Sequence, residues 1–345
     1  MYLHAIASAF PEQAYTQTQC LEYLQSLPQT QALQPRSQAL LRKVLSSDSG
    51  IDKRHIAIDP IDRVFALDAQ GQNRAFEYLA PQLAKQALTK ALCQANLVPG
   101  QIDALLVCTC TGYLCPGLSS HIAEQLGLPA GSILQDIVGL GCGAAIPTLR
   151  QASQVAAANP QAVVATIAVE VCTAAFYMND DPGVLISLCL FGDGAAAALW
   201  TGESPGRGAW RADHFQSLHW PEHREKVRFV NANGHLCNQL DRNVPTISAE
   251  AVHQLYQSRS SSSHPAPRVI THTGGRDVLE AIRNKLPEAE LNESTAVLSQ
   301  FGNLSSPSVL IALEHFLNAP VGDAAWLSAF GAGFSCHACE VRRHL

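Results

Sequence analysis

The sequence predicts an α/β protein made of two similar halves, each alternating buried strands with helices. Short apolar runs alternate with longer segments rich in Ala and Leu, which favours strands joined by helices. In both parts of the chain, residues with reactive side chains stand where a strand turns into a helix. Residues 201–208 form the most linker-like segment in the middle of the chain. We therefore expect halves of residues 1–205 and 206–345, with the active site where they meet.

The first half shows the alternation clearly. A short N-terminal strand precedes a Gln-rich helical stretch over residues 16–45, and residues 73–96 predict an amphipathic helix. Residues 103–109 have almost no polar side chains, as is typical of a central parallel strand. A further helix over 119–127 and another buried strand over 162–169 continue the pattern.

Cys142 is the first candidate for catalysis. The apolar run 133–138 predicts a buried strand, and residues 144–158 predict an Ala-rich helix in which the early Pro147 is tolerated. Cys142 then stands near a helix N-terminus, where free N–H groups and the helix dipole favour a thiolate. The glycines on either side leave room for a substrate. The alternative interpretation is a small buried cysteine in a packed turn.

The second half repeats this organisation. A short strand over 268–270 ends at His272, and a helix follows. Asn303 stands in a second turn, before a helix over 307–317. Residues 324–345 predict two apolar strands joined by a glycine-containing loop.

Composition limits the classes of function. Of 345 residues, 47% are hydrophobic and 15% charged, so the chain can bury a large core. Few charges are typical of subunits that bury surface against each other, and we expect a homo-oligomer. A formal net charge of -6 argues against nucleic-acid binding. No apolar run reaches the ~20 residues of a membrane span, and no signal peptide is predicted. We expect a cytoplasmic protein.

The cysteines predict reduced thiols and no metal site. There are eleven, an odd number, scattered through apolar segments, whereas a disulfide framework usually shows an even set in loops. Cys108 and Cys110 with Cys115, or Cys336 with Cys339, have spacings that occur in metal sites. Neither group has the second pair of ligands that zinc requires.

Cys142, His272 and Asn303 together predict chemistry on acyl groups. A cysteine partnered by a histidine and an amide side chain is a recurring arrangement for nucleophilic attack on acyl carbons. Histidine can take the thiol proton or pair with the thiolate, and asparagine can donate a hydrogen bond to an oxygen that becomes negative.

The sequence resembles type III polyketide synthases, the chalcone synthase-like branch of the thiolase superfamily, over nearly its whole length. GLGCGAAIPTLR is similar to the nucleophile segment and matches Cys142. THTGGRDVL resembles the His-Pro-Gly-Gly segment and matches His272, with Thr273 in place of the usual proline. FGNLSSPSV resembles the Gly-Asn-Met/Leu-Ser-Ser segment and matches Asn303. LFGDGAAA is a further hallmark, and its Phe191 matches the gatekeeper between the coenzyme A tunnel and the cavity.

The resemblance implies the duplicated, five-layered αβαβα thiolase fold, a homodimer and decarboxylative condensation. An acyl starter would move from its thioester to Cys142. Malonyl-CoA would lose CO2 to give an enolate, stabilised by His272 and Asn303, that attacks the acyl-enzyme. The lengthened chain would return to Cys142 for further rounds and then cyclise to a pyrone- or resorcinol-type product. The family's substrates are coenzyme A thioesters, and the resemblance implies no cofactor, because the departing CO2 supplies the carbanion.

The resemblance also assigns residues to the substrate cavity. Positions expected to shape it are Thr111, Cys172, Ala175, Asn238 and Ser305. Ala175 is smaller than the threonine of the plant enzymes, and Asn238 replaces a phenylalanine that helps to gate the tunnel. These departures, with Ala332 in the C-terminal AFGAG, imply a bacterial-type synthase with a non-plant starter, for which a fatty acyl group is one candidate.

Two more residues are assigned by the resemblance. Cys115 falls on the loop that reaches the partner subunit's cavity in the family. Lys53, beside Arg54, aligns with the basic coenzyme A entrance, although the cluster could equally be a solvated turn before a strand.

Two other functions fit the same residues. One is a ketoacyl-ACP synthase III-like enzyme that performs a single condensation, although such enzymes usually carry His-Gln-Ala-Asn where this chain has His-Thr-Gly-Gly. The other is an inactive thiolase-fold scaffold or subunit partner. The sequence leaves open whether the starter arrives on coenzyme A or on an acyl carrier protein.

Overall fold

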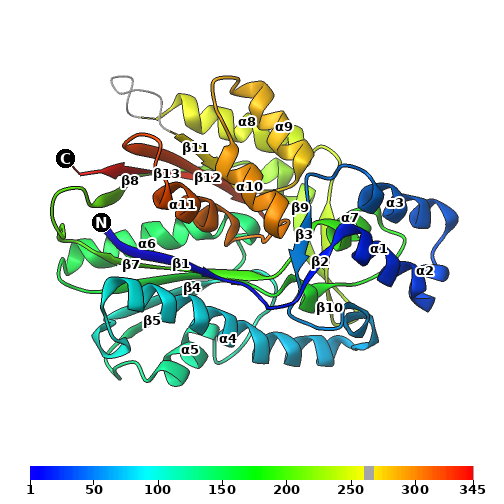
Figure 1. The fold of residues 1–345 in the computed structure, drawn as a ribbon, viewed down its shortest axis with the longest axis horizontal. Coiled ribbons are helices and arrows are strands. Elements are labelled where there is room, and N and C mark those ends of the chain that lie inside the picture. Colours follow the sequence, from blue (N-terminus) through cyan, green and yellow to red (C-terminus); the bar gives the residue numbers. More distant parts are fainter. Residues whose placement is uncertain (260–267, 345) are drawn as a thin grey trace.

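The strands of the first half form one hydrogen-bonded series in a computed structural model that describes residues 1–259 and 268–344 (Figure 1). The order in space is β5-β4-β6-β7-β1. Their bounds are β1 Tyr2–Ala9, β4 Ala104–Cys108, β5 Ile133–Ile137, β6 Val164–Glu170 and β7 Gly194–Thr201. β4 is parallel to β5 and β6, whereas β7 runs antiparallel to both β6 and β1.

The strands of the second half repeat this pairing. They are β8 (Trp210–His219), β11 (Arg268–Thr271), β12 (Ala324–Gly331) and β13 (Ser335–Arg343). β11 is parallel to β12, and β13 runs antiparallel to β12 and β8. A short antiparallel pairing of β1 with β8 joins the two series into a nine-stranded sheet. The boundary between halves 1–205 and 206–345 remains a prediction.

Helices lie outside and between the two series of strands, in the order helix, sheet, helix, sheet, helix (Figure 1). α4 and α5 cover the first series from outside, and α8 and α9 cover the second. α6 and α11 touch strands of both halves and form the central layer. The bounds are α4 Ala69–Ala95, α5 Leu118–Leu126, α6 Ala145–Ala158, α8 Val244–Gln257, α9 Arg276–Lys285 and α11 Ser308–Asn318. This is the predicted αβαβα arrangement.

The residue pattern explains these positions. Every residue of β4, β6 and β7 is buried, as expected of strands with helices on both faces. α6 buries alanines and Leu149, which allows close packing in the central layer. α4 begins at Ala69, before the expected residue 73, because the Asp68 side chain accepts a hydrogen bond from Gly71 N at 2.7 Å.

The remaining elements cover one side of this body. The predicted helical stretch 16–45 is broken into α1 (Gln17–Ser26), α2 (Pro28–Gln31) and α3 (Pro35–Ser46), because each proline begins a new helix. The short antiparallel pair of β2 (Ala14–Thr16) and β3 (Lys53–His55) flanks them. Later in the chain come α7 (Pro182–Leu190), β9 (Val227–Ala232), β10 (His235–Leu240) and α10 (Asn292–Phe301).

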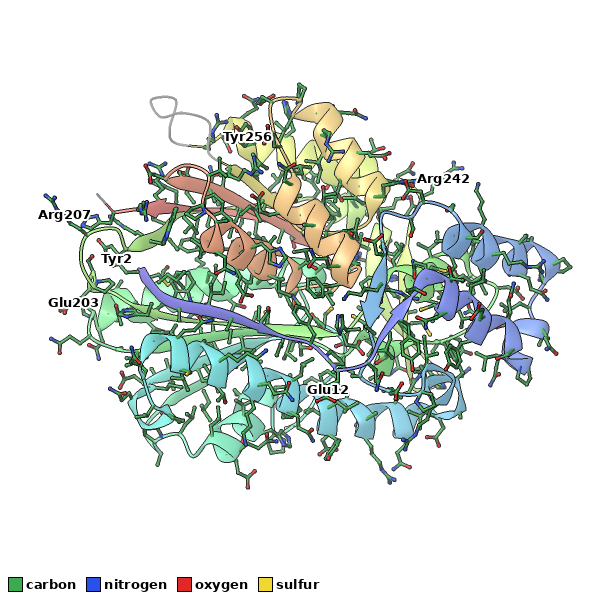
Figure 2. All side chains as sticks on the ribbon, in the orientation of Figure 1. Tyr2, Glu12, Glu203, Arg207, Arg242 and Tyr256 are labelled. Carbon is green, nitrogen blue, oxygen red and sulfur yellow. The ribbon has the colours of Figure 1, made fainter. Side chains whose placement is uncertain are left out.

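The link between the halves lies far from the β9–β10 hairpin. In Figure 2, Glu203 and Arg207, which belong to the link between β7 and β8, are at the left of the view. Arg242, which follows β10, is at the right. None of the described helices is long and apolar enough to cross a membrane.

The prediction that residues 133–138 form a buried strand is wrong about burial. β5 lies at the end of the sheet and pairs only with β4. Ile133, Leu134 and Val138 are 53%, 42% and 49% exposed, so this apolar edge is open in the single chain. An apolar run predicts that its residues are buried. It does not say whether the same chain or another surface packs against them.

Candidate active site

Strand ends of both halves bring the reactive residues together. Because β4, β5 and β6 are parallel, their carboxyl ends share one edge of the sheet. Cys110 follows β4, Cys142 follows β5, and Glu170 is the last residue of β6. In the second half, His272 directly follows β11. The two sets meet at a cavity that both Cys142 and His272 line.

Cys142 lies in a tight turn that leads into a helix. Residues Gly141–Gly143 form one 3-10 turn, and α6 begins at Ala145. Gly141 has a φ of 57°, and a Cβ there would meet the Ala332 nitrogen at 2.9 Å. A Cβ on Gly331 would meet the Cys142 nitrogen at 2.9 Å, so the C-terminal loop packs directly against this turn. The predicted position of Cys142 at the start of a helix is confirmed.

His272 presents its ring to the cavity from the end of β11. Its backbone N donates to Ser328 O at 2.9 Å, and its ring contacts Phe330 edge-on, with centroids 5.2 Å apart. The buried Nδ1 has no hydrogen-bond partner among the described residues. The imidazole also interacts with the Cys142 sulfur. The ring is therefore fixed by packing beside the Cys142 sulfur, at the wall of the cavity.

Asn303 has a defined amide orientation. Its Oδ1 accepts a hydrogen bond from Ser305 N at 2.9 Å, so its Nδ2 must be the group that donates. Nδ2 reaches only Gly274 O, at a long 3.3 Å. The backbone is held by Asn303 N to Leu190 O at 2.9 Å and Gly192 N to Asn303 O at 3.1 Å. The amide can therefore donate to a substrate oxygen.

Two thiols share one hydroxyl at the centre of the site. Ser305 Oγ lies 3.2 Å from Cys142 Sγ and 3.1 Å from Cys110 Sγ. A hydroxyl can donate one hydrogen bond and accept another, so Ser305 can donate to the Cys142 thiolate and accept from the Cys110 thiol. Ser305 has a φ of 59°, a strained value for a non-glycine residue, which occurs mainly at functional sites.

Electrostatics distinguish the two thiols. The neighbouring Cys110 thiol, together with the His272 imidazole and the Ser305 hydroxyl, holds the pKa of Cys142 well below its usual value despite burial. The thiolate at Cys142, burial and the Glu170 carboxylate raise the pKa of Cys110 well above its usual value. Cys142 is therefore the thiolate and Cys110 the neutral donor.

Glu170 is a buried carboxylate at the back of the site. It accepts hydrogen bonds from Thr111 Oγ1 at 2.8 Å, Cys110 N at 3.0 Å and Thr109 Oγ1 at 3.1 Å, and also from Ser306. Burial raises its pKa, and these donors oppose the effect. The carboxylate thus fixes the loop after β4 that carries Cys110.

Arg54 supports the site from behind. It is fully buried, and its Nη1 donates to Leu188 O at 2.7 Å and Phe191 O at 2.8 Å. Its side chain also packs under Gly302, where a Cβ would lie 2.8 Å from Arg54 Cγ. Phe191 and Asn303 form an isolated parallel bridge at this point. Arg54 therefore holds the backbones of both the predicted gatekeeper and the amide.

Two cavities receive most of the predicted site residues. One is lined by Cys142, His272, Asn303, Phe191 and Asn238, with the aromatic rings of Phe229 and Phe330. The adjoining one is lined by Thr111, Cys172, Ala175 and Ser305, and it shares Phe191, Phe229 and Asn238 with the first. The residues predicted around the substrate thus lie together, whereas their individual roles remain predictions.

Cys115 and Lys53 lie outside both cavities. Cys115 is exposed in the loop between β4 and α5, and Lys53 is exposed on β3. Their assignments to the partner's cavity and to coenzyme A remain predictions.

Sequence reasoning missed the roles of Cys110, Glu170 and Arg54. The sequence indicated only a metal-ligand spacing at Cys110, although the next residue, Thr111, is one of the positions predicted to shape the substrate cavity. Glu170 is the one charged residue of an otherwise apolar buried strand, and this contrast was a usable signal. The sequence indicated only that Arg54 belongs to a short basic cluster with Lys53. Among residues 1–259 and 268–344, no group of three or more His, Cys, Asp or Glu side chains is placed to hold a metal ion.

Two family models match successive parts of the chain. Residues 7–254 match the family model of FAE1/Type III polyketide synthase-like proteins. Residues 265–343 match the C-terminal model of 3-oxoacyl-[acyl-carrier-protein] synthase III. The first match includes Cys142 and the second includes His272 and Asn303.

Individual relatives cover almost the whole chain. A 1,3,6,8-tetrahydroxynaphthalene synthase from Streptomyces peucetius is 28% identical over 344 residues, which cover 96% of this chain and 90% of the relative. A phloroglucinol synthase from Pseudomonas fluorescens is 26% identical over 338 residues, with 94% of each chain covered.

The fold is shared with solved structures. The 1,3,6,8-tetrahydroxynaphthalene synthase from Streptomyces coelicolor superposes with a TM-score of 0.88 at 24% identity, covering 100% of both chains. The chain therefore belongs to the type III polyketide synthase family, whose members are acyltransferases with the thiolase fold.

Proposed function

We propose that this enzyme condenses malonyl-CoA with an acyl group held on Cys142, repeats the condensation and cyclises the product. The observation that carries this proposal is the convergence of Cys142, His272 and Asn303 on one cavity. A thiolate, an imidazole and an amide donor are the groups that acyl transfer and enolate formation require.

The geometry supports a division of labour. The Cys142 thiolate attacks the starter thioester, and coenzyme A departs as a thiol. When malonyl-CoA loses CO2, negative charge develops on the thioester oxygen, and donors from His272 and Asn303 Nδ2 lower the energy of that enolate. The enolate carbon then attacks the acyl carbon on Cys142, which releases the thiolate for the next round.

We propose a small starter and a compact ring product. The cavity volumes are about 50 Å³ for the outer one and about 20 Å³ for the inner one, which is small for a ligand site, and the rings of Phe191 and Phe229 line both. Relatives named for tetrahydroxynaphthalene and phloroglucinol make small aromatic products. A long fatty acyl starter, the other candidate, would need space beyond these cavities.

A panel of acyl-CoA starters with malonyl-CoA, followed by product mass, tests the proposal. We expect pyrone- or resorcinol-type products, or phenolic rings, with malonyl-CoA or short acyl-CoA preferred over long chains. A single ketoacyl product, formed only from an acyl carrier protein, would instead establish the ketoacyl synthase function. No turnover with any starter, and a Cys142 no more reactive to iodoacetamide than the other cysteines, would establish the inactive scaffold.

We further propose a homodimer formed through the β5 edge. Its unpaired backbone groups and the exposed Ile133, Leu134 and Val138 offer both hydrogen bonds and apolar surface to a second copy. Cys115, in the loop preceding α5, would then contribute to the partner's cavity, as the resemblance implies. Sedimentation of the wild type and of Leu134→Lys tests this: we expect a dimer and a monomer, respectively. A monomeric wild type at micromolar concentration would refute the dimer.

The remaining assignments concern coenzyme A and location. We propose that Lys53 interacts with coenzyme A phosphates and that the enzyme acts in the cytoplasm, where its eleven free cysteines would stay reduced. Lys53→Glu should raise the KM for malonyl-CoA and leave kcat nearly unchanged. An unchanged KM would remove Lys53 from the coenzyme A site.

A further inference from the structure

The site contains a second thiol that forms no covalent bond in the proposed condensation. Of the eleven cysteines, seven are buried and two are fully exposed. Cys110 and Cys142 are the two that are half-buried, and each lines one of the adjoining cavities. A small molecule that reaches the nucleophile therefore meets both thiols.

The two thiols are linked by contacts. Ser305 Oγ lies 3.1 Å from Cys110 Sγ and 3.2 Å from Cys142 Sγ, and the Cys110 thiol is the largest cause of the low pKa of Cys142. Both lie in irregular segments at strand ends: Cys110 in a bend after β4 and Cys142 in the turn before α6. Loop positions can make the small backbone adjustments that a disulfide requires.

The chemical states of the two sulfurs are complementary. Cys142 is a thiolate, the form that reacts with peroxides, and it is reachable from the cavity. Cys110 is a protonated thiol, held in place because Glu170 accepts its backbone N–H at 3.0 Å. A low-pKa, accessible cysteine beside a second cysteine is the arrangement found in redox-sensing proteins.

We propose that Cys110 and Cys142 form a reversible disulfide when a hydroperoxide enters the cavity, with Cys142 as the oxidised nucleophile and Cys110 as the resolving thiol. This goes beyond the proposed condensation, because it assigns a reaction to Cys110 that needs no acyl substrate.

The reaction balances with hydrogen peroxide as the oxidant. The Cys142 thiolate attacks one peroxide oxygen, the O–O bond breaks, and the departing hydroxide takes a proton to become water. Cys142 is then a sulfenic acid. The Cys110 sulfur attacks the Cys142 sulfur, the S–O bond breaks, and the hydroxyl leaves with the Cys110 proton as a second water. Two thiols have lost two electrons, and one peroxide has gained them.

The disulfide would protect the nucleophile. A sulfenic acid without a neighbouring thiol is oxidised further to sulfinic acid, which ordinary thiols do not reduce. Capture by Cys110 stops oxidation at a stage that a dithiol reverses. Synthesis would therefore pause under peroxide and resume afterwards.

Peptide mapping of the peroxide-treated enzyme tests the proposal. After brief treatment with hydrogen peroxide and alkylation without reduction, we expect a digest product joining the Cys110 and Cys142 peptides. Dithiothreitol should then restore the iodoacetamide reactivity of Cys142. In Cys110→Ser, Cys142 should appear as sulfinic acid, with iodoacetamide reactivity restored to only about a tenth of what the same variant shows before peroxide. Cys93→Ser is the matched control and should behave as the wild type, because Cys93 is exposed on α4 and lines neither cavity.

Each outcome decides the question. If wild-type Cys142 is oxidised but no Cys110–Cys142 peptide forms, or if Cys110→Ser recovers as well as the wild type, the proposal is wrong. If Cys110→Ser does not fold, Cys110→Ala replaces it, and the wild-type peptide map alone remains decisive. These readouts need no turnover, so failure of the disulfide is distinguishable from failure of the condensation.

Discussion

The two halves of the molecule share one pattern of strands and helices but place different chemistry at equivalent points. Cys142 precedes α6 and Asn303 precedes α11, and these two helices form the central layer. Cys110 follows β4 and His272 follows β11, and each of these strands is parallel to the next strand of its series. The first half thus supplies thiols, and the second half supplies hydrogen-bond donors.

This difference explains how a duplicated scaffold becomes one site. A nucleophile must be held as a thiolate, which the first half favours with a helix N-terminus and a neighbouring thiol. An enolate must find donors that do not themselves attack, and the second half offers an imidazole and an amide. Because the two sets stand on separate halves, one step can be removed while the other persists.

Removing the thiol of the first half should have the largest effect. In Cys142→Ala we expect condensation to fall at least about a thousandfold, because no acyl-enzyme can form. Decarboxylation of malonyl-CoA should persist in part, since His272 and Asn303 are unchanged. Product mass and release of labelled CO2 measure the two steps separately. Complete loss of decarboxylation in a folded variant would contradict the role given to the second half.

Removing the amide of the second half should slow decarboxylation and leave the reactivity of Cys142 nearly unchanged. In Asn303→Ala we expect decarboxylation to slow about a hundredfold, the usual effect of losing one oxyanion donor. Alkylation of Cys142 by iodoacetamide should stay close to the wild-type rate. Asn303→Asp is the matched control, because it keeps an acceptor for Ser305 N but has no donor. If the aspartate variant were as fast as the wild type, the donor role would be refuted.

The fold was predictable because its signals are local. The buried strands over 103–109 and 162–169 and the repeated alternation were read correctly from hydrophobic runs alone. β5 was not, because Ile133 and Leu134 are as apolar as core residues and only the sheet order shows that they lie at an edge. Hydrophobic periodicity predicts that a face of a strand is buried, but it does not identify the surface that packs against that face.

The site was predictable only where the residue type and its position at a turn indicate a chemical role. Cys142 could be recognised from its turn and helix, and His272 and Asn303 from their positions at turns. The shared contacts of Cys110 and Ser305 depend on the packing of two segments far apart in sequence. Arg54 could not be assigned, since its partners are two backbone carbonyl groups and the neutral side chain of Gln17, none of which is an acidic residue that would mark a buried arginine.

Loss of Arg54 should weaken the junction between the halves. In Arg54→Met the buried carbonyl groups of Leu188 and Phe191 lose their donor, which should lower the free energy of unfolding by about 3 kcal/mol. Urea denaturation measures this, with Arg74→Met, an exposed arginine on α4, as the matched control. Equal midpoints for the two variants would show that Arg54 does not hold this junction.

The smallest expected effect concerns Ser305, a residue of the second half that contacts both thiols of the first. Its hydroxyl favours the Cys142 thiolate, so Ser305→Ala should raise the pKa of Cys142 toward the ordinary value and move the alkylation profile to higher pH. At neutral pH the alkylation rate should be about fivefold lower, which corresponds to about 1 kcal/mol, the usual net size of one hydrogen bond. Ser306→Ala is the matched control, because its hydroxyl contacts Glu170 rather than either sulfur.

Because wild-type Cys142 has a depressed pKa, its alkylation should fall little between pH 9 and pH 7, whereas that of free glutathione should fall about tenfold per unit below its pKa. A Ser305 variant with the wild-type profile would mean that the thiolate depends only on His272, Cys110 and the helix N-terminus, and that the halves cooperate through the imidazole alone.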